Sequence, residues 1–203
     1  MAARRRFPRV AGCLAVPRPQ DEQGLIRQHW HWLNGAILAG SAVFSYPGRD
    51  YVLIGLMLFL PLFDCGWRIP ALPRSRYQYL IWAGLLAAAI AILAWRPSET
   101  PFALATLVLA ALPEEWFFRA YFMARLGQGI RANALASLLF SMLHGLTRGW
   151  ITAGLVFIPS LFYGWLYQRT RDMPLLTLAH ALSNLIYAVF LAEFITSFIG
   201  NLR

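Results

Sequence analysis

The sequence predicts an all-α fold, a polytopic bundle of transmembrane helices. Of the 203 residues, 59% are hydrophobic and 13% are charged, which is about half the charged fraction of an ordinary soluble domain. Apolar stretches of near-spanning length recur from about residue 32 to the C-terminus. These two observations favour a helical membrane protein of about seven spans, with six to eight compatible with the pattern.

The predicted spans occupy residues 29–203, which are expected to form a single transmembrane domain. They run over Trp30–Tyr46, Tyr51–Trp67, Tyr79–Trp95, Phe102–Met123, Ala132–Leu146, Trp150–Tyr167 and Leu175–Ile199. Several of these segments are short for a helix that crosses a bilayer. One of the first two is therefore also compatible with a re-entrant or tilted hairpin. Residues 1–28, which are basic and contain proline, are expected to form a cytoplasmic tail.

The distribution of arginine predicts the orientation in the membrane. With the N-terminus in the cytoplasm, the outer loops contain only Arg49, Arg96, Arg148 and Arg203, and the other loop arginines lie inside. This positive-inside bias predicts seven spans with a cytoplasmic N-terminus. The formal net charge of +9 is therefore interpreted as a topology signal, and no nucleic-acid partner is expected.

Three ionised side chains lie within the predicted fourth span. Glu114, Glu115 and Arg119 fall within six residues of an otherwise apolar stretch, where each charge costs a few kcal/mol. Glu115 and Arg119 are four residues apart and share a helical face, so they are predicted to pair. Glu114 is rotated by about 100° from Glu115 and needs a partner from another helix. His144 and His180, one in each of two later apolar segments, are the candidates.

Sequence spacing places Glu114, His144 and His180 at similar depth. Counted from the flanking arginines at 1.5 Å per residue, all three lie roughly 14–20 Å from the cytoplasmic side. A carboxylate and an imidazole that hold one water make a general base for hydrolysis. Asn184, one turn after His180, would join it as a second donor to an oxyanion. Phe140, one turn before His144, is expected to line the same cavity.

Each of these residues also has a plain structural interpretation. The Glu115–Arg119 pair could tie helices together, and a single histidine or asparagine in an apolar helix often serves as an interhelical hydrogen-bonding group. The cluster is also compatible with an ion path in a transporter or proton-coupled carrier. Asp64 and Glu193, near span ends, are expected at the membrane interface. The joint occurrence of the polar groups at matched depth favours a reactive site.

Three motifs resemble the signature of a known family. They are Glu114-Glu115-x-x-x-Arg119, Phe140-x-x-x-His144 and His180-x-x-x-Asn184. In this order they are similar to the motifs of the CAAX protease and bacteriocin-processing (CPBP) family. Its members are intramembrane glutamic endopeptidases related to the CAAX prenyl endopeptidase. The resemblance covers about residues 100–190, the expected catalytic core, and the combination is more specific than any single motif.

The resemblance implies a role for each motif residue. The implied catalytic residues are Glu114, His144, His180 and Asn184, and the implied supporting residues are Glu115, Arg119 and Phe140. Glu114 would activate water together with His144, while the second histidine and the asparagine would stabilise the oxyanion. The enzyme would hydrolyse a peptide bond of a membrane-associated protein or peptide, with the lipid bilayer as its other partner.

No cofactor is expected. The motifs offer Glu and His ligands on three helices but no HExxH run, so zinc is compatible with the site and not favoured. The resemblance implies a bacterial inner-membrane protein. There it favours a peptide, a bacteriocin-like product or a C-terminal sorting tail over a prenylated substrate. A catalytically inactive relative that acts as a scaffold is the remaining alternative.

Overall fold

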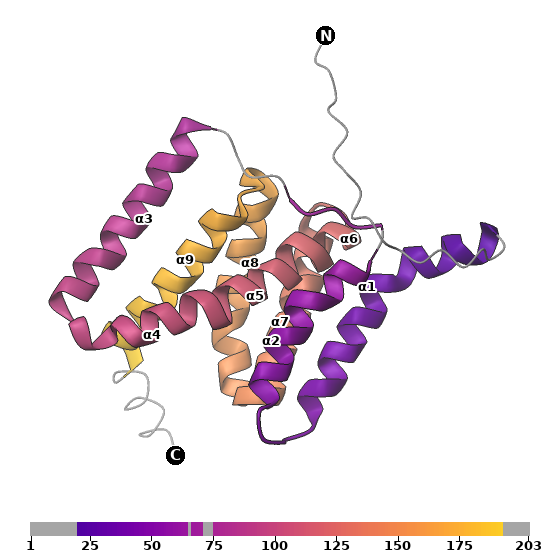
Figure 1. Cartoon of the computed structure of the whole chain (residues 1–203), viewed down its shortest axis with the longest axis horizontal. Helices are drawn as coiled ribbons and strands as arrows, with labels where there is room; N and C mark the ends of the chain where they lie inside the picture. The colour runs from indigo at the N-terminus through magenta and orange to yellow at the C-terminus, as the bar shows by residue number, and fades with distance from the viewer. Residues whose placement is uncertain (1–19, 65, 71–74, 193–203) are drawn as a thin grey trace, which may run out of the picture.

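The protein is a helical bundle in the computed structural model, which describes residues 20–64, 66–70 and 75–192 (Figure 1). Every regular element in this part of the chain is a helix, which confirms the predicted all-α class. Helical segments follow the seven predicted spans one for one. Four of them, over Arg76–Trp95, Pro97–Leu126, Trp150–Thr170 and Met173–Leu191, are long and apolar enough to cross a membrane.

The first two helices form a hairpin. Helix α1 spans Gln20–Val43, so it begins within the predicted tail of residues 1–28, and residues 1–19 lie outside the described part of the chain. Helix α2 spans Arg49–Phe59 and continues as the 3₁₀ turn η1, Leu60–Phe63. Together α2 and η1 reach about 24 Å, less than the roughly 30 Å of a bilayer core. The second predicted span is therefore a short helix, compatible with the tilted or re-entrant hairpin left open by the sequence.

The third helix, α3, spans Arg76–Trp95 and lies at the edge of the bundle beside α9, opposite the α1–α2 hairpin (Figure 1). None of its residues is buried, as expected of a helix whose apolar side chains face lipid. It is fixed to the rest of the bundle by polar contacts as well. Trp82 Nε1 donates to Asp172 Oδ2 at 2.9 Å, and Asp172, which is fully buried, also caps helix α9 by accepting from Leu175 N.

One continuous helical rod carries the predicted fourth span. After the 3₁₀ turn η2 its elements are α4, η3, α5, η4 and α6. Their bounds are Pro97–Glu99 for η2, Thr100–Ala105 for α4, Thr106–Ala111 for η3, Leu112–Glu115 for α5, Trp116–Met123 for η4 and Ala124–Leu126 for α6. Both η3 and η4 are π-helical. Four aromatic side chains of η4 are at most 1% exposed and form the centre of the core. They are Phe117, Phe118, Tyr121 and Phe122.

The last three helices complete the bundle. Helix α7 spans Ile130–Arg148, α8 spans Trp150–Thr170, and α9 spans Met173–Ile186 and continues into the π-helical η5, Tyr187–Leu191. Helices α7 and α8 pack along each other as an antiparallel pair, joined through Gly149 alone. Gly149 has φ of 95°, a conformation that glycine adopts without strain. The predicted seventh span extends to residue 199, and its last residues, including Glu193, lie outside the described residues.

Candidate active site

The two glutamates sit in one α-helical turn between two π-helical segments. Pro113, in the turn Leu112–Glu115, has no N–H to donate and its ring crowds the preceding turn. The wider π-helical turn of η3, which precedes it, relieves this crowding. π-helical segments inside α-helices are frequent at functional sites. The local sequence thus changes the helical winding at the point where both carboxylates enter the core, Glu114 being 8% and Glu115 1% exposed.

Glu114 faces histidines from two other helices. Its Oε1 lies 3.9 Å from His144 Nε2 on α7, and its Oε2 lies 3.6 Å from His180 Nε2 on α9. All three side chains are buried, with residue exposures of 7–8%. The matched depth expected from sequence spacing is thus realised as a contact of three helices around one carboxylate.

Glu115 has two partners rather than the single one expected. Its Oε2 lies 3.4 Å from Arg119 Nε, the predicted pair within the helix. Its Oε1 accepts a hydrogen bond from His180 Nδ1 at 2.8 Å. The carboxylate therefore joins Arg119, which has no exposed surface, to the imidazole that faces Glu114.

Hydrogen bonds orient both imidazoles in the same way. His144 Nδ1 donates to the Phe140 carbonyl oxygen at 3.1 Å, and His180 Nδ1 donates to Glu115. Because both acceptors lack a proton, each Nδ1 must carry one. Both rings consequently turn Nε2 toward Glu114. In a neutral ring this nitrogen offers a lone pair, and in a protonated ring it carries a second N–H.

Phe140 packs against every member of this cluster except the glutamates. Its ring centroid lies 4.4 Å from that of His144, 6.3 Å from that of His180, and 5.6 Å from the Arg119 guanidinium carbon. It is itself 4% exposed. This aromatic side chain thus packs against both histidines, but the cavity beside Glu114 and His144 is lined by other residues, so the expectation that Phe140 lines it is not met.

Asn184 is the predicted site residue that does not touch the cluster. It lies on α9 one turn beyond His180, is half-buried, and its amide has no hydrogen bond to the described residues. The neighbouring Ser183 is engaged elsewhere, because it accepts from Tyr163 at 2.7 Å.

Helix α8 contributes two residues that the sequence did not reveal. Ser160 Oγ accepts from Arg119 Nη2 at 2.6 Å. Tyr163 stacks on the His180 ring, with centroids 5.2 Å apart and an interplanar angle of 18°. Both are at most 5% exposed. They lie three residues apart, a spacing that puts them on one face of α8, but this pattern was not distinct in a helix that is apolar on all sides.

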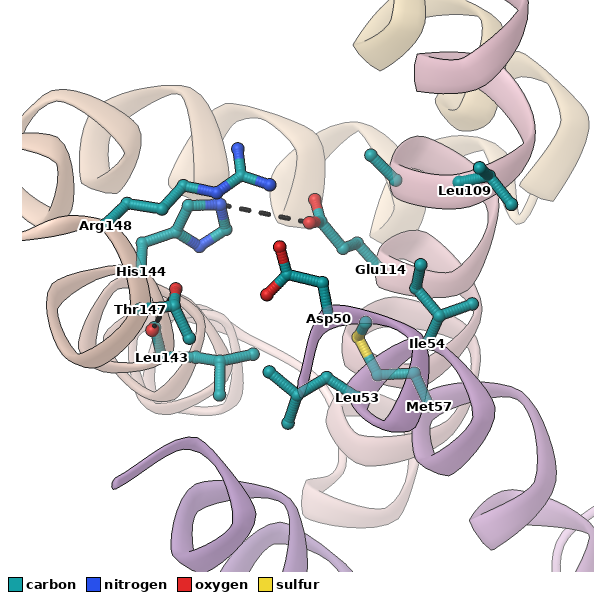
Figure 2. Close-up of a pocket in the computed structure, with 11 residues that line it drawn as sticks. Asp50, Leu53, Ile54, Met57, Leu109, Glu114, Leu143, His144, Thr147 and Arg148 are labelled. Atoms are coloured by element: carbon teal, nitrogen blue, oxygen red, sulfur yellow. Dashed lines mark hydrogen bonds and ion pairs between the residues drawn. The ribbon is translucent and has the colours of Figure 1, made fainter. Parts of the chain in front are cut away.

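A cavity of about 60 Å³ opens onto Glu114 and His144 (Figure 2). Side chains of α2, η3 and α7 form its apolar walls, among them Leu53, Met57 and Leu143. Such a volume holds a few water molecules, at about 30 Å³ each in the liquid. The cavity lies near the end of α7, since His144 is one turn from its last residue, Arg148.

The same cluster contains side chains of the types that bind zinc. Among the described residues no group of three or more His, Cys, Asp or Glu side chains has the arrangement that holds a metal ion. Glu114, His144 and His180 have suitable ligand atoms, and these are the residues that would be tested for zinc.

Comparison with known proteins gives a family for the central part of the chain. Residues 96–186 match the family model described as type II CAAX prenyl endopeptidase Rce1-like. This range contains all three motifs and the whole rod from η2 to α6, together with α7, α8 and α9. No curated protein and no solved structure matches the chain.

The match and the apolar helices agree on the class of protein. Proteases of this family act on peptide bonds in the membrane, and four helices of the described chain have the length and composition to span one. Residues 96–186, somewhat less than half of the chain, are thus similar to the Rce1-like domain of the type II CAAX prenyl endopeptidases, and together with the apolar helices this match makes the chain an integral membrane protein.

Proposed function

We propose that the chain is a glutamic endopeptidase that hydrolyses a peptide bond of a membrane-associated protein or peptide. The observation that carries the proposal is the position of Glu114, whose two oxygens face the Nε2 atoms of His144 and His180. The separations of 3.9 and 3.6 Å are longer than direct hydrogen bonds. A water between the groups can bond to both sides of each gap.

In the proposed reaction, Glu114 and His144 hold the attacking water. The water oxygen bonds to the carbonyl carbon of the substrate, and its proton passes to the Glu114 carboxylate. The C–N bond then breaks, and the same proton passes to the nitrogen of the leaving amine. The products are a free carboxylate and a free amine, and no covalent intermediate with the protein is required.

His180 and Asn184 are proposed to donate hydrogen bonds to the oxyanion. His180 can donate from Nε2 only as an imidazolium, because its other proton is used toward Glu115. In this form the imidazolium and the Arg119 guanidinium stand beside the Glu114 and Glu115 carboxylates, one cation for each anion. The Asn184 amide, unengaged by the described residues, is one turn away and free to turn toward a substrate.

The proposal is tested with full-length protein in lipid vesicles and with cells. Membrane peptides from cells that express the wild type and the Glu114→Gln variant are compared by mass spectrometry. We expect some peptides to appear in the wild type and not in Glu114→Gln. The rate of cleavage in vesicles should fall by at least about 10²-fold, the size of the effect seen when a group in direct contact with the reacting atoms is removed. Glu99→Gln, at the start of the same rod, is the matched control.

Two further arms separate the alternatives. Cleavage that persists in a chelator supports the glutamate–histidine mechanism, and cleavage that is lost and then restored by Zn²⁺ would assign the cluster to a metal. If ion flux falls in Glu114→Gln while the membrane peptides stay the same as in the wild type, the site is instead assigned to transport. We also propose a bacterial inner-membrane location with the N-terminus in the cytoplasm, which cysteine labelling from either side of the membrane would test.

A further inference from the structure

The mouth of the Glu114 cavity is charged, unlike its walls. Asp50 at the start of α2 and Arg148 at the end of α7 both line the cavity (Figure 2). Arg49 lies next to them. These three residues lie at the start of α2 and the end of α7, which meet where the Arg49 guanidinium donates to the Thr147 carbonyl oxygen at 3.1 Å.

Two of the three charges are already engaged with each other. The side chain of Arg49 is 18% exposed, and its Nε lies 3.7 Å from Asp50 Oδ1. Its Nη2 is held by Thr147. Arg49 is therefore fixed against the protein and partly offsets the Asp50 carboxylate, which is 73% exposed.

Arg148 is different. It is exposed, and its guanidinium has neither an ion pair nor a hydrogen bond with any of the described residues. It follows His144 by four positions on α7, so the two side chains share a helical face. Figure 2 shows its guanidinium beside the His144 imidazole and toward Glu114. A guanidinium with five N–H donors, and with no acceptor among the described residues, is thus placed at the mouth of the reactive cavity.

The predicted topology makes this arginine unusual. Only four loop arginines fall on the predicted outer side, and Arg49 and Arg148 are two of them. The general bias against arginine on that side does not account for two that meet at one cavity. A binding role gives a reason for both residues. Arg49 is held in place by Asp50 and Thr147, and Arg148 has no partner among the described residues.

We propose that Arg148 binds a carboxylate of the peptide substrate and so selects peptides whose cleaved bond lies close to such a group. This inference rests on the proposed function, because the cavity must receive the peptide bond to be hydrolysed. A carboxylate matches the planar fork of a guanidinium and forms two parallel hydrogen bonds with it. Apolar residues next to the carboxylate would contact Leu53, Met57 and Leu143 in the cavity.

The position of the guanidinium favours a peptide carboxylate over a lipid phosphate. Arg148 lines the same cavity as Glu114 and His144, where the proposed reaction takes place, so the group next to this guanidinium during cleavage belongs to the peptide. The carboxylate could belong to the C-terminus of the peptide or to an acidic side chain, and the experiment separates these two sources.

The test uses full-length protein in neutral lipid vesicles and three pools of short synthetic peptides. The first pool has free C-terminal carboxylates, the second has carboxamides instead, and the third has carboxamides with one internal Asp or Glu. We expect the wild type to cleave the first pool about tenfold faster than the second at low peptide concentration. Tenfold corresponds to about 1.4 kcal/mol. In Arg148→Gln this ratio should fall to about one, and in Arg148→Lys it should lie between.

The matched control is Arg96→Gln. Arg96 is also on the predicted outer side, but it stacks over Trp95 at 4.6 Å and does not line the cavity. The control should keep the tenfold ratio. The inference is overturned if the wild type cleaves neither the first nor the third pool faster than the second, or if the preference is unchanged in Arg148→Gln. A preference for the first pool alone assigns the carboxylate to the C-terminus, a preference for the third pool alone assigns it to an acidic side chain, and a preference for both means that the site accepts either.

A binding measurement keeps this inference separate from the proposed function. If the wild type cleaves no pool, the proposed function fails, and binding of the same pools to the wild type decides the role of Arg148. Tighter binding of the carboxylate pool that is lost in Arg148→Gln supports the site, and equal binding of the pools overturns it. A further outcome is that the wild type and Arg148→Gln differ only when anionic lipid is added to the vesicles, and not in their dependence on the peptide carboxylate. That result would mean that Arg148 contacts the membrane, and it would overturn the inference.

Discussion

Glu115 and His180 lie 65 positions apart in the sequence, and their side chains meet in a buried hydrogen bond of 2.8 Å between Oε1 and Nδ1. The other oxygen of Glu115 lies 3.4 Å from Arg119 Nε. One carboxylate thus fixes the ring of His180, directs its Nε2 toward Glu114, and balances the charge of a fully buried guanidinium. Partners of this kind set the orientation of a histidine and the ring nitrogen that carries the proton.

Replacing Glu115 by Gln should therefore reduce both activity and stability. The amide cannot accept from His180 and from Arg119 at once, because one of its two ends is a donor. We expect the rate of peptide cleavage to fall by about 10²–10⁴-fold, the range seen when a histidine loses the carboxylate that orients it. Breaking the buried pair should also cost about 3–5 kcal/mol, measured as a lower melting temperature in detergent.

A double variant separates these two effects. Glu115→Gln combined with Arg119→Met removes both buried charges, which should restore much of the lost stability. It should not restore cleavage, because a neutral amide cannot balance the His180 imidazolium that is proposed to stabilise the oxyanion, even where its carbonyl oxygen still accepts from Nδ1. Recovery of both properties together would mean that Glu115 only stabilises the fold. Glu99→Gln is the control for each measurement and should change stability by less than about 0.5 kcal/mol.

Ser160→Ala should destabilise the protein through Arg119. The hydroxyl accepts from Nη2 at 2.6 Å, and Nη1 has no hydrogen bond with the described residues. Removing the acceptor leaves a buried donor unsatisfied, at a cost of about 1–3 kcal/mol. Thermal unfolding of Ser160→Ala is compared with that of Ser98→Ala, an exposed serine before the same rod. Equal melting temperatures for the two variants would contradict this contact.

Two substitutions separate the contribution of the Tyr163 ring from that of its hydroxyl. Tyr163→Phe loses only the hydrogen bond to Ser183, worth about 0.5–1.5 kcal/mol of stability. Tyr163→Leu also loses the stacking on His180, worth roughly the same again. Because the ring restrains the imidazole, we expect kcat to fall in the Leu variant and to change little in the Phe variant. The same two substitutions at Tyr51, which is 74% exposed, provide the control.

The sequence predicts the placement of the helices better than the partners of the charged residues. The apolar stretches locate the helical segments because a spanning helix must be apolar along its length. The meeting of Glu114 with His144 and His180 was expected because three costly polar groups at similar depth have few other partners. The second partner of Glu115 was not expected, since it depends on the rotation of α9 about its own axis.

Helix α8 shows why the remaining contacts could not be read from the sequence. In a membrane helix both the lipid-facing side and the core-facing side are apolar, so hydrophobic periodicity does not identify the buried face. Ser160 and Tyr163 could therefore not be assigned to the site. Asp64 is a similar case, because its position near a span end predicts the membrane interface but does not reveal its partner: it is 4% exposed and lies 3.1 Å from Arg125 Nε.

The pairing of α7 with α8 gives a last prediction, based on the close approach at Gly164. A Cβ atom added there would meet the Asn133 side chain well inside contact distance, and the Asn133 amide donates to the Leu161 carbonyl oxygen at 2.8 Å. Gly164→Ala must therefore displace Asn133 and break this interhelical hydrogen bond. We expect a loss of about 1–3 kcal/mol, seen as a lower melting temperature.

Gly154→Ala on the same helix is the matched control, because a Cβ atom there has nothing within 4 Å. Alanine favours a helix over glycine by about 1 kcal/mol, so this control should be neutral or slightly stabilising. The two substitutions make the same chemical change in one helix and differ only in what the new methyl group meets. Opposite effects on melting temperature would support the close crossing of α7 and α8 that holds His144 opposite Glu114, and equal effects would contradict it.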